Sequence, residues 1–180
     1  MINIPEQDLQ YVTSLEEIGW GSVLVAITLT LHAFGMVYTL HASGALKSWF
    51  DHTHSFARGI GIIIVTSMMI ILAHLLEVTV WAWFFLWKGA MPNFSLSFYF
   101  SLMDYTTLGS NYNLPLRWRL LEGMIAIAGL MTFAWSTGIL LTVVQEFQEQ
   151  QLQNLKQRRR KHPVQSTPPS APGSDETKHA

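Results

Sequence analysis

Three long apolar stretches, separated by short polar ones, set the pattern of the chain. They cover residues 18–46, 59–87 and 120–147. Each is longer than the roughly 20 apolar residues that a helix needs to cross a bilayer. The pattern therefore predicts an all-α membrane protein with three transmembrane helices.

A fourth stretch, residues 94–118, lies between the second and third apolar runs and reads FSLSFYFSLMDYTTLGSNYNLPLRW. It is too short, and too polar at its end, to cross a bilayer. Residues 95–106 carry the pattern of a short buried helix, and Gly109 and Asn111 suit left-handed turn conformations. Non-helical backbone at membrane depth is tolerated only where it is buried in protein or lines a watery cavity. The stretch is therefore predicted to be a re-entrant pore helix followed by a filter loop.

The expected organisation has five parts. Residues 1–17 form an outer N-terminal segment, 18–46 the first transmembrane helix, 47–58 an inner loop, 59–147 a pore module and 148–180 a polar tail on the cytoplasmic side. Residues 145–161 can continue the third helix, whereas the composition after residue 161 is typical of a disordered tail. We expect no signal peptide, because the first 17 residues contain no Lys or Arg.

Basic residues set the expected orientation. Lys47, Arg58 and the basic residues of 156–161 fall on one side of a three-span protein. The positive-inside rule then places the N-terminus outside and the C-terminus in the cytoplasm, in the plasma membrane. Tryptophans near the outer ends of the spans suggest an interfacial belt, made of Trp20, Trp81, Trp83, Trp87 and Trp118.

Composition agrees with a membrane protein and narrows its chemistry. The chain is 49% apolar and 13% charged, and its net charge of −1 gives no reason to expect a nucleic-acid partner. It has no cysteine, so neither a disulfide nor a thiolate metal site can form. The expected partners are membrane lipid and further copies of the chain.

The segment FYFSLMDYTTLG resembles the pore helix and filter entry of the potassium-channel family. The downstream blocks WRLLEG and TFAWSTGILL are similar to small bacterial members of the two-transmembrane ion-channel group. The resemblance covers residues 59–147 and leaves the first helix unexplained. It implies a homotetrameric cation channel, which agrees with the need for several copies of a re-entrant strand to surround an ion. Such a protein conducts K⁺ or Na⁺ passively and is not an enzyme.

The filter departs from the family pattern T-V-G-Y-G-D. Thr107 and Gly109 are kept, whereas Leu108 replaces the Val, and Ser110-Asn111-Tyr112 replaces Tyr-Gly-Asp. The inner half of the filter is preserved, and the outer half is expected to form a wider vestibule. The resemblance therefore supports cation conduction better than strict potassium selectivity, and a non-conducting relative is the alternative. The predicted ion pathway consists of Thr106, Thr107, Leu108, Gly109, Ser110 and Asn111.

Three further residues are expected to serve this pathway. Asp104 lies in the last turn of the pore helix, where we expect it to brace the filter from behind; direct contact with ions is the alternative. Gly129 and Gly138 in the third span are candidate hinges of a gate. Both glycines are equally explained as small residues for close helix packing.

A second constellation consists of His32, His74 and Glu77. His74 and Glu77 share a helix face, and His32 lies near the middle of the first span. Ionisable groups at the bilayer centre are costly and usually paired. The expected explanation is a buried hydrogen-bonded pair that fixes the first span against the second. Two alternatives remain open: a divalent metal held by the three residues, or a haem held by two histidines, with His41 as a spare ligand.

Overall fold

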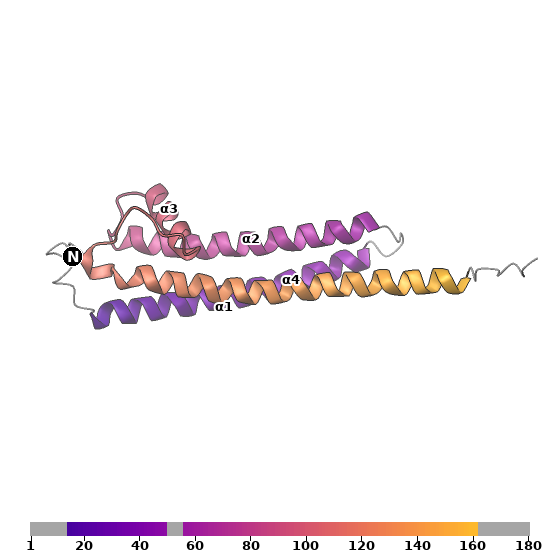
Figure 1. The fold of residues 1–180 in the computed structure, drawn as a ribbon. Helices are drawn as coiled ribbons and strands as arrows, with labels where there is room; N and C mark the ends of the chain where they lie inside the picture. The colour runs from indigo at the N-terminus through magenta and orange to yellow at the C-terminus, as the bar shows by residue number, and fades with distance from the viewer. Residues whose placement is uncertain (1–13, 50–55, 162–180) are drawn as a thin grey trace, which may run out of the picture. The chain divides into compact units, whose positions relative to one another are not determined.

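The computed structural model describes residues 14–49 and 56–161. Over these ranges all the regular secondary structure is helical, as predicted, and there is no strand. The elements follow in the order α1 (Leu15–Trp49), α2 (Phe56–Trp87), α3 (Phe94–Tyr105), a 3₁₀ turn η2 (Leu116–Trp118) and α4 (Leu120–Lys161), as Figure 1 shows.

Three of the helices are long and apolar enough to cross a membrane, which confirms the three predicted hydrophobic segments. The candidate spans are Leu15–Leu46, Gly59–Trp87 and Leu116–Gln153. The chain divides into two compact units at residues 145 and 146, and α4 crosses this boundary. In the second unit the helix continues to Lys161, as the sequence pattern predicted. The expected outer segment up to residue 13, part of the expected inner loop and the tail from residue 162 lie outside the described residues.

Side-chain contacts fix how α1, α2 and the first part of α4 pack in the first unit. Trp81 in α2 donates its indole N–H to the Thr28 hydroxyl of α1 at 2.9 Å, and the rings of Trp20 and Trp87 meet edge to face at 5.7 Å. These pairs run in opposite directions along the two sequences, so α1 and α2 are antiparallel. Glu17 at the start of α1 accepts from the Leu120 backbone N–H at 3.1 Å. The first turns of α1 and α4 therefore lie side by side.

Helix α3 packs against the C-terminal end of α2 (Figure 1). Asn93 caps its first turn by accepting from the Leu96 N–H at 2.9 Å. The Ser97 hydroxyl donates to the Ala82 carbonyl at 2.6 Å, and Phe100 meets Phe85 edge to face at 5.5 Å. The apolar core gathers at this end of the first unit and includes Val78, Trp81, Phe84, Phe85, Phe100, Tyr105, Leu114, Trp118, Leu121 and Ile125.

Two of the five tryptophans expected at the membrane interface have a different environment. Trp81 is fully buried and Trp118 nearly so, whereas Trp83 and Trp87 are exposed. Trp81 turns inward because Thr28 offers its indole N–H a partner inside the protein. Trp118 packs edge to face against Phe84 at 5.8 Å. Both rings therefore join α2 to its neighbours.

Candidate filter segment and buried histidine–glutamate cluster

Helix α3 ends in a Schellman motif. The Leu108 N–H donates to the Met103 carbonyl at 3.0 Å, and the Thr107 N–H donates to the Asp104 carbonyl at 2.9 Å. This pair of bonds needs a left-handed residue just after the helix cap, a position that usually belongs to glycine. Here Thr107 occupies it, with φ 62°.

Thr107 is the one non-glycine residue with positive φ in the described part of the chain. A β-branched side chain in the left-handed region is a genuine outlier, because its Cβ crowds the backbone. Gly109, at φ 73°, has the positive φ that the sequence predicted, whereas Asn111 does not. The strain therefore lies at the threonine that the resemblance places first in the filter.

The candidate filter segment, residues 106–111, leaves backbone carbonyls without partners. Among the described residues, no N–H or O–H group donates to the carbonyl oxygens of Thr106, Thr107, Leu108 or Gly109. These residues are exposed in the single chain, Leu108 to 74%. Unpaired carbonyls at membrane depth cost several kcal/mol each unless another group satisfies them, roughly as for any buried polar group. Within one chain, these four carbonyl oxygens therefore have no protein donor among the described residues.

The loop after the filter segment is tied back to the fold. Ser110 Oγ donates to the Tyr112 carbonyl at 2.8 Å and accepts from the Tyr112 N–H at 3.2 Å. The Leu114 N–H donates to Glu122 Oε1 at 2.7 Å, which fixes the loop to the first turn of α4. Ser110 thus stabilises a local turn at the position where the potassium-channel pattern has a tyrosine.

Asp104 lies behind the segment and contacts it through the backbone. Its carboxylate accepts from the Ser110 N–H, and its Oδ2 atom is buried without a hydrogen-bond partner. Burial, together with the nearby Glu122 carboxylate, raises the pKa of Asp104 to about 6. Asp104 thus contacts the backbone of the segment, and its bracing role stays a prediction.

The two glycines named as hinges differ in their surroundings. A side chain at Gly129 would collide with the Tyr105 carbonyl oxygen at the end of α3, whereas Gly138 has open space around it. Close approach of α3 to α4 therefore accounts for the glycine at 129. A hinge role for either residue stays a prediction.

The structure brings together His32, His74 and Glu77 in the interior of the first unit. His32 Nδ1 lies 2.8 Å from Glu77 Oε1, and His74 Nδ1 lies 3.7 Å from Glu77 Oε2. His32 and Glu77 are almost completely buried, and His74 is partly exposed. The buried hydrogen bond expected between the first two spans is thus present. His41, the suggested spare ligand, is exposed and contacts the Val37 carbonyl instead.

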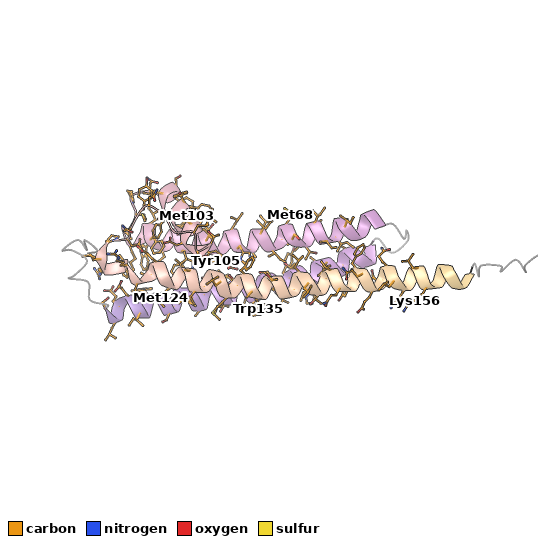
Figure 2. The ribbon with its side chains drawn as sticks, in the orientation of Figure 1. Met68, Met103, Tyr105, Met124, Trp135 and Lys156 are labelled. Atoms are coloured by element: carbon orange, nitrogen blue, oxygen red, sulfur yellow. The ribbon has the colours of Figure 1, made fainter. Side chains whose placement is uncertain are left out.

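Two residues that the sequence did not single out complete the buried cluster, which we define as His32, His74, Glu77, Tyr105 and Ser136. The Tyr105 hydroxyl at the end of α3 donates to Glu77 Oε2 and lies 2.9 Å from His74 Nδ1. Figure 2 shows Tyr105 between α2 and α4. Ser136 Oγ on α4 lies 3.2 Å from His32 Nε2 and 3.0 Å from His74 Nε2. Four helices thus contribute to one polar network.

The cluster and the filter segment are neighbours. Tyr105 belongs to the cluster and immediately precedes Thr106, the first residue of the segment. A partly open cavity of about 430 Å³ is lined by residues of α2, α3 and α4, including His74, Tyr105, Thr107 and Gly129. The cavity joins the polar network to the strained residue.

In comparisons with family models, curated proteins and solved structures, the chain has no match. The function of the chain is therefore inferred from its own residues and geometry.

Proposed function

We propose that the chain is the subunit of a homotetrameric cation channel, with α3 and residues 106–111 forming a re-entrant pore helix and filter. The carbonyl oxygens of Thr106, Thr107, Leu108 and Gly109, which accept no hydrogen bond from any described residue, carry the proposal. Rings of such carbonyls replace the hydration shell of a permeant ion. Four copies around an axis would supply the ring that one chain lacks.

Two further observations support this arrangement. Thr107 is held in a strained conformation by the Schellman motif, and backbone strain of this kind clusters at functional sites. The carboxylate of Asp104 accepts from the Ser110 N–H, so the segment is tied to the last turn of α3. Neither the Schellman motif nor the Asp104 contact uses the carbonyl oxygens of residues 106–109 as hydrogen-bond acceptors. Both contacts therefore hold the backbone of the segment while leaving these oxygens without a donor in the described part of the chain.

The expected orientation has the N-terminus outside and the filter entered from the outside. The first turn of α1 contacts the first turn of α4 through Glu17 and the Leu120 N–H, so the start of the third span and the start of the first share one side. α4 would be the inner helix that sets access to the pore, in a plasma membrane.

Flux through purified protein in liposomes tests the proposal. We expect cation flux that depends on Thr107, with K⁺ and Na⁺ both permeant because the outer filter residues differ from the potassium-channel pattern. Thr107→Val keeps the shape of the side chain, removes its hydroxyl and should lower flux several-fold.

Thr30→Val is the matched control, because the Thr30 hydroxyl on α1 contacts only the Ala26 carbonyl at 2.7 Å. It should leave flux unchanged. Absence of flux for K⁺, Na⁺ and a divalent cation, in protein shown to be tetrameric by crosslinking, would overturn conduction and favour a non-conducting relative.

A further inference from the structure

We propose that the buried cluster is a metal site in which His32 Nδ1, His74 Nδ1 and the Glu77 carboxylate bind Zn²⁺. This inference goes beyond ion conduction and does not rest on it. It gives the first helix, which the channel resemblance leaves unexplained, a role of its own.

The hydrogen bonds of Ser136 determine which ring nitrogens are available. Ser136 Oγ donates its single hydrogen to the Thr132 carbonyl at 2.9 Å. Its lone pairs can then accept from His32 Nε2–H at 3.2 Å and His74 Nε2–H at 3.0 Å. With Nε2 protonated, each neutral imidazole presents the lone pair of Nδ1. Both lone pairs are therefore on the side of the carboxylate.

The centre of the cluster has more hydrogen-bond acceptor atoms than hydrogens to donate to them. His32 Nδ1 and Glu77 Oε1 lie 2.8 Å apart, a hydrogen-bond distance at which two acceptors need a proton between them. A bound metal ion would take the place of that proton and move the two atoms apart. The Tyr105 hydroxyl supplies one hydrogen, although it faces Glu77 Oε2, His74 Nδ1 and Thr132 Oγ1. Burial makes an unscreened cluster of lone pairs costly. A divalent cation satisfies all of them at once.

The spacing of the ligand atoms suits such an ion. The candidate ligand atoms of His32, His74 and Glu77 all lie within 4.8 Å of one another. Zinc binds nitrogen and oxygen at about 2.0–2.2 Å, so tetrahedral ligand atoms lie about 3.4 Å apart. The 3.7 Å between His74 Nδ1 and Glu77 Oε2 is close to that value. The 2.8 Å between His32 Nδ1 and Glu77 Oε1 would have to widen to about 3.4 Å, which small side-chain rotations can provide.

The donor set selects the class of metal. Two imidazoles and a carboxylate suit Zn²⁺ and neighbouring first-row ions, whereas Mg²⁺ and Ca²⁺ prefer oxygen ligands alone. Ligating histidines usually donate the other ring N–H to a fixed acceptor that orients the ring. Ser136 is that acceptor for both rings, and the Tyr105 hydroxyl orients the carboxylate. The cavity beside His74 and Tyr105 offers an approach for the ion.

Cobalt titration tests the site directly. Untagged protein in detergent is stripped with a chelator and titrated with Co²⁺, whose tetrahedral complexes absorb visible light. We expect one Co²⁺ per chain with a visible band that Zn²⁺ removes. His32→Gln and His74→Gln should each abolish the band. His41→Gln should keep it, because His41 is exposed on the same helix as His32 and lies outside the cluster.

Ser136→Ala separates metal binding from folding, because it leaves all three ligands in place. Loss of an orienting partner should weaken Co²⁺ binding by about 10- to 100-fold. A wild-type protein without the visible band would overturn the proposal. So would a band that persists in both His32→Gln and His74→Gln, or a Ser136→Ala variant with unchanged affinity. Liposome flux of the same preparations is scored separately, so failure of the metal site and failure of conduction are distinguishable.

Discussion

The buried cluster and the candidate filter segment are adjacent, and they treat polar groups in opposite ways. In the cluster, side chains from α1, α2, α3 and α4 meet, and each nitrogen and oxygen of its side chains has a polar neighbour within the same chain. In residues 106–109, four successive carbonyl oxygens have no donor among the described residues. The cluster is a contact completed by folding, whereas residues 106–109 stay exposed in the single chain.

The cluster therefore contributes to the stability of the fold, whereas the segment, the candidate functional region, costs stability. Buried polar groups that are mutually satisfied specify one packing of the helices. A strained residue followed by unpaired carbonyls costs stability in the single chain, and such strain persists only where the surroundings impose it. Tyr105 links the two regions, because its side chain lies in the cluster and its peptide leads into Thr106. The cluster can therefore hold the end of α3 against the strain of the segment.

The largest expected effect comes from breaking the cluster. Glu77→Gln replaces a carboxylate that faces His32, His74 and Tyr105 with an amide that cannot satisfy all three. Leaving buried hydrogen-bonding groups without a partner costs about 1–3 kcal/mol, and more where a charged group is involved. We expect a loss of about 3 kcal/mol in the free energy of unfolding, measured by thermal unfolding in detergent.

Glu16→Gln is the matched control for that substitution. Glu16 makes an exposed ion pair with Arg117 at 2.6 Å, and exposed pairs of this kind contribute about 0–1 kcal/mol. A Glu77→Gln variant no less stable than Glu16→Gln would show that the cluster does not organise the helices.

The next effect is a pH dependence that originates at Asp104. Its pKa of about 6 in the folded protein exceeds the ordinary value of 3.8. The protonated acid is thus favoured by folding, so its stabilising contribution is complete below about pH 4 and is lost as the pH rises through 6. A difference of about two pKa units corresponds to about 2–3 kcal/mol.

Thermal unfolding of wild type and Asp104→Asn between pH 4 and pH 8 measures this contribution. The stability of the wild type relative to Asp104→Asn should fall across that window and level off above it. A difference between the two proteins that is independent of pH, or that grows as the pH rises, would contradict the assignment. The comparison also tests whether the protonated form of Asp104 stabilises the filter segment.

Sequence and structure agree where local pattern decides the outcome. Long apolar runs define the spans, and the rule that buried ionisable groups pair anticipated the contact of His32 with Glu77. Tyr105 and Ser136 were missed because only the packing of α3 and α4 brings them to the histidines. Glu17 looks like part of a polar outer segment, yet it is buried and accepts from the Leu120 N–H. The contacts of Glu17 with Leu120 and of His32 with Ser136 join residues more than 100 positions apart, so neither partner can be read from the local sequence.

Gly129→Ala probes the junction between the two regions. The added methyl group would meet the Tyr105 carbonyl oxygen, so either α3 or α4 must shift. Overpacking of this kind costs about 1–3 kcal/mol, and we expect about 2 kcal/mol by thermal unfolding. Gly138→Ala, where nothing lies within 4 Å, should instead stabilise the helix by up to about 1 kcal/mol. Equal effects at the two positions would contradict close packing as the reason for Gly129.

The smallest expected effect distinguishes strain from function at Thr107. Glycine adopts φ 62° without steric cost, so Thr107→Gly should raise the free energy of unfolding by about 1 kcal/mol. Thr106→Gly is the control, because Thr106 has an ordinary φ of −85° and glycine there relieves no strain. The substitution adds freedom to the unfolded chain and removes the hydroxyl that donates to the Leu102 and Met103 carbonyls. We expect Thr106→Gly to be less stable than wild type. If Thr107→Gly is more stable and loses more cation flux in liposomes than Thr107→Val, which lacks the same hydroxyl, the strain at this residue contributes to conduction. A Thr107→Gly variant that is less stable than wild type would show that the left-handed conformation is not the source of strain. Of the two observations that favour a functional site, strain at Thr107 and carbonyl oxygens without donors among the described residues, only the second would then remain.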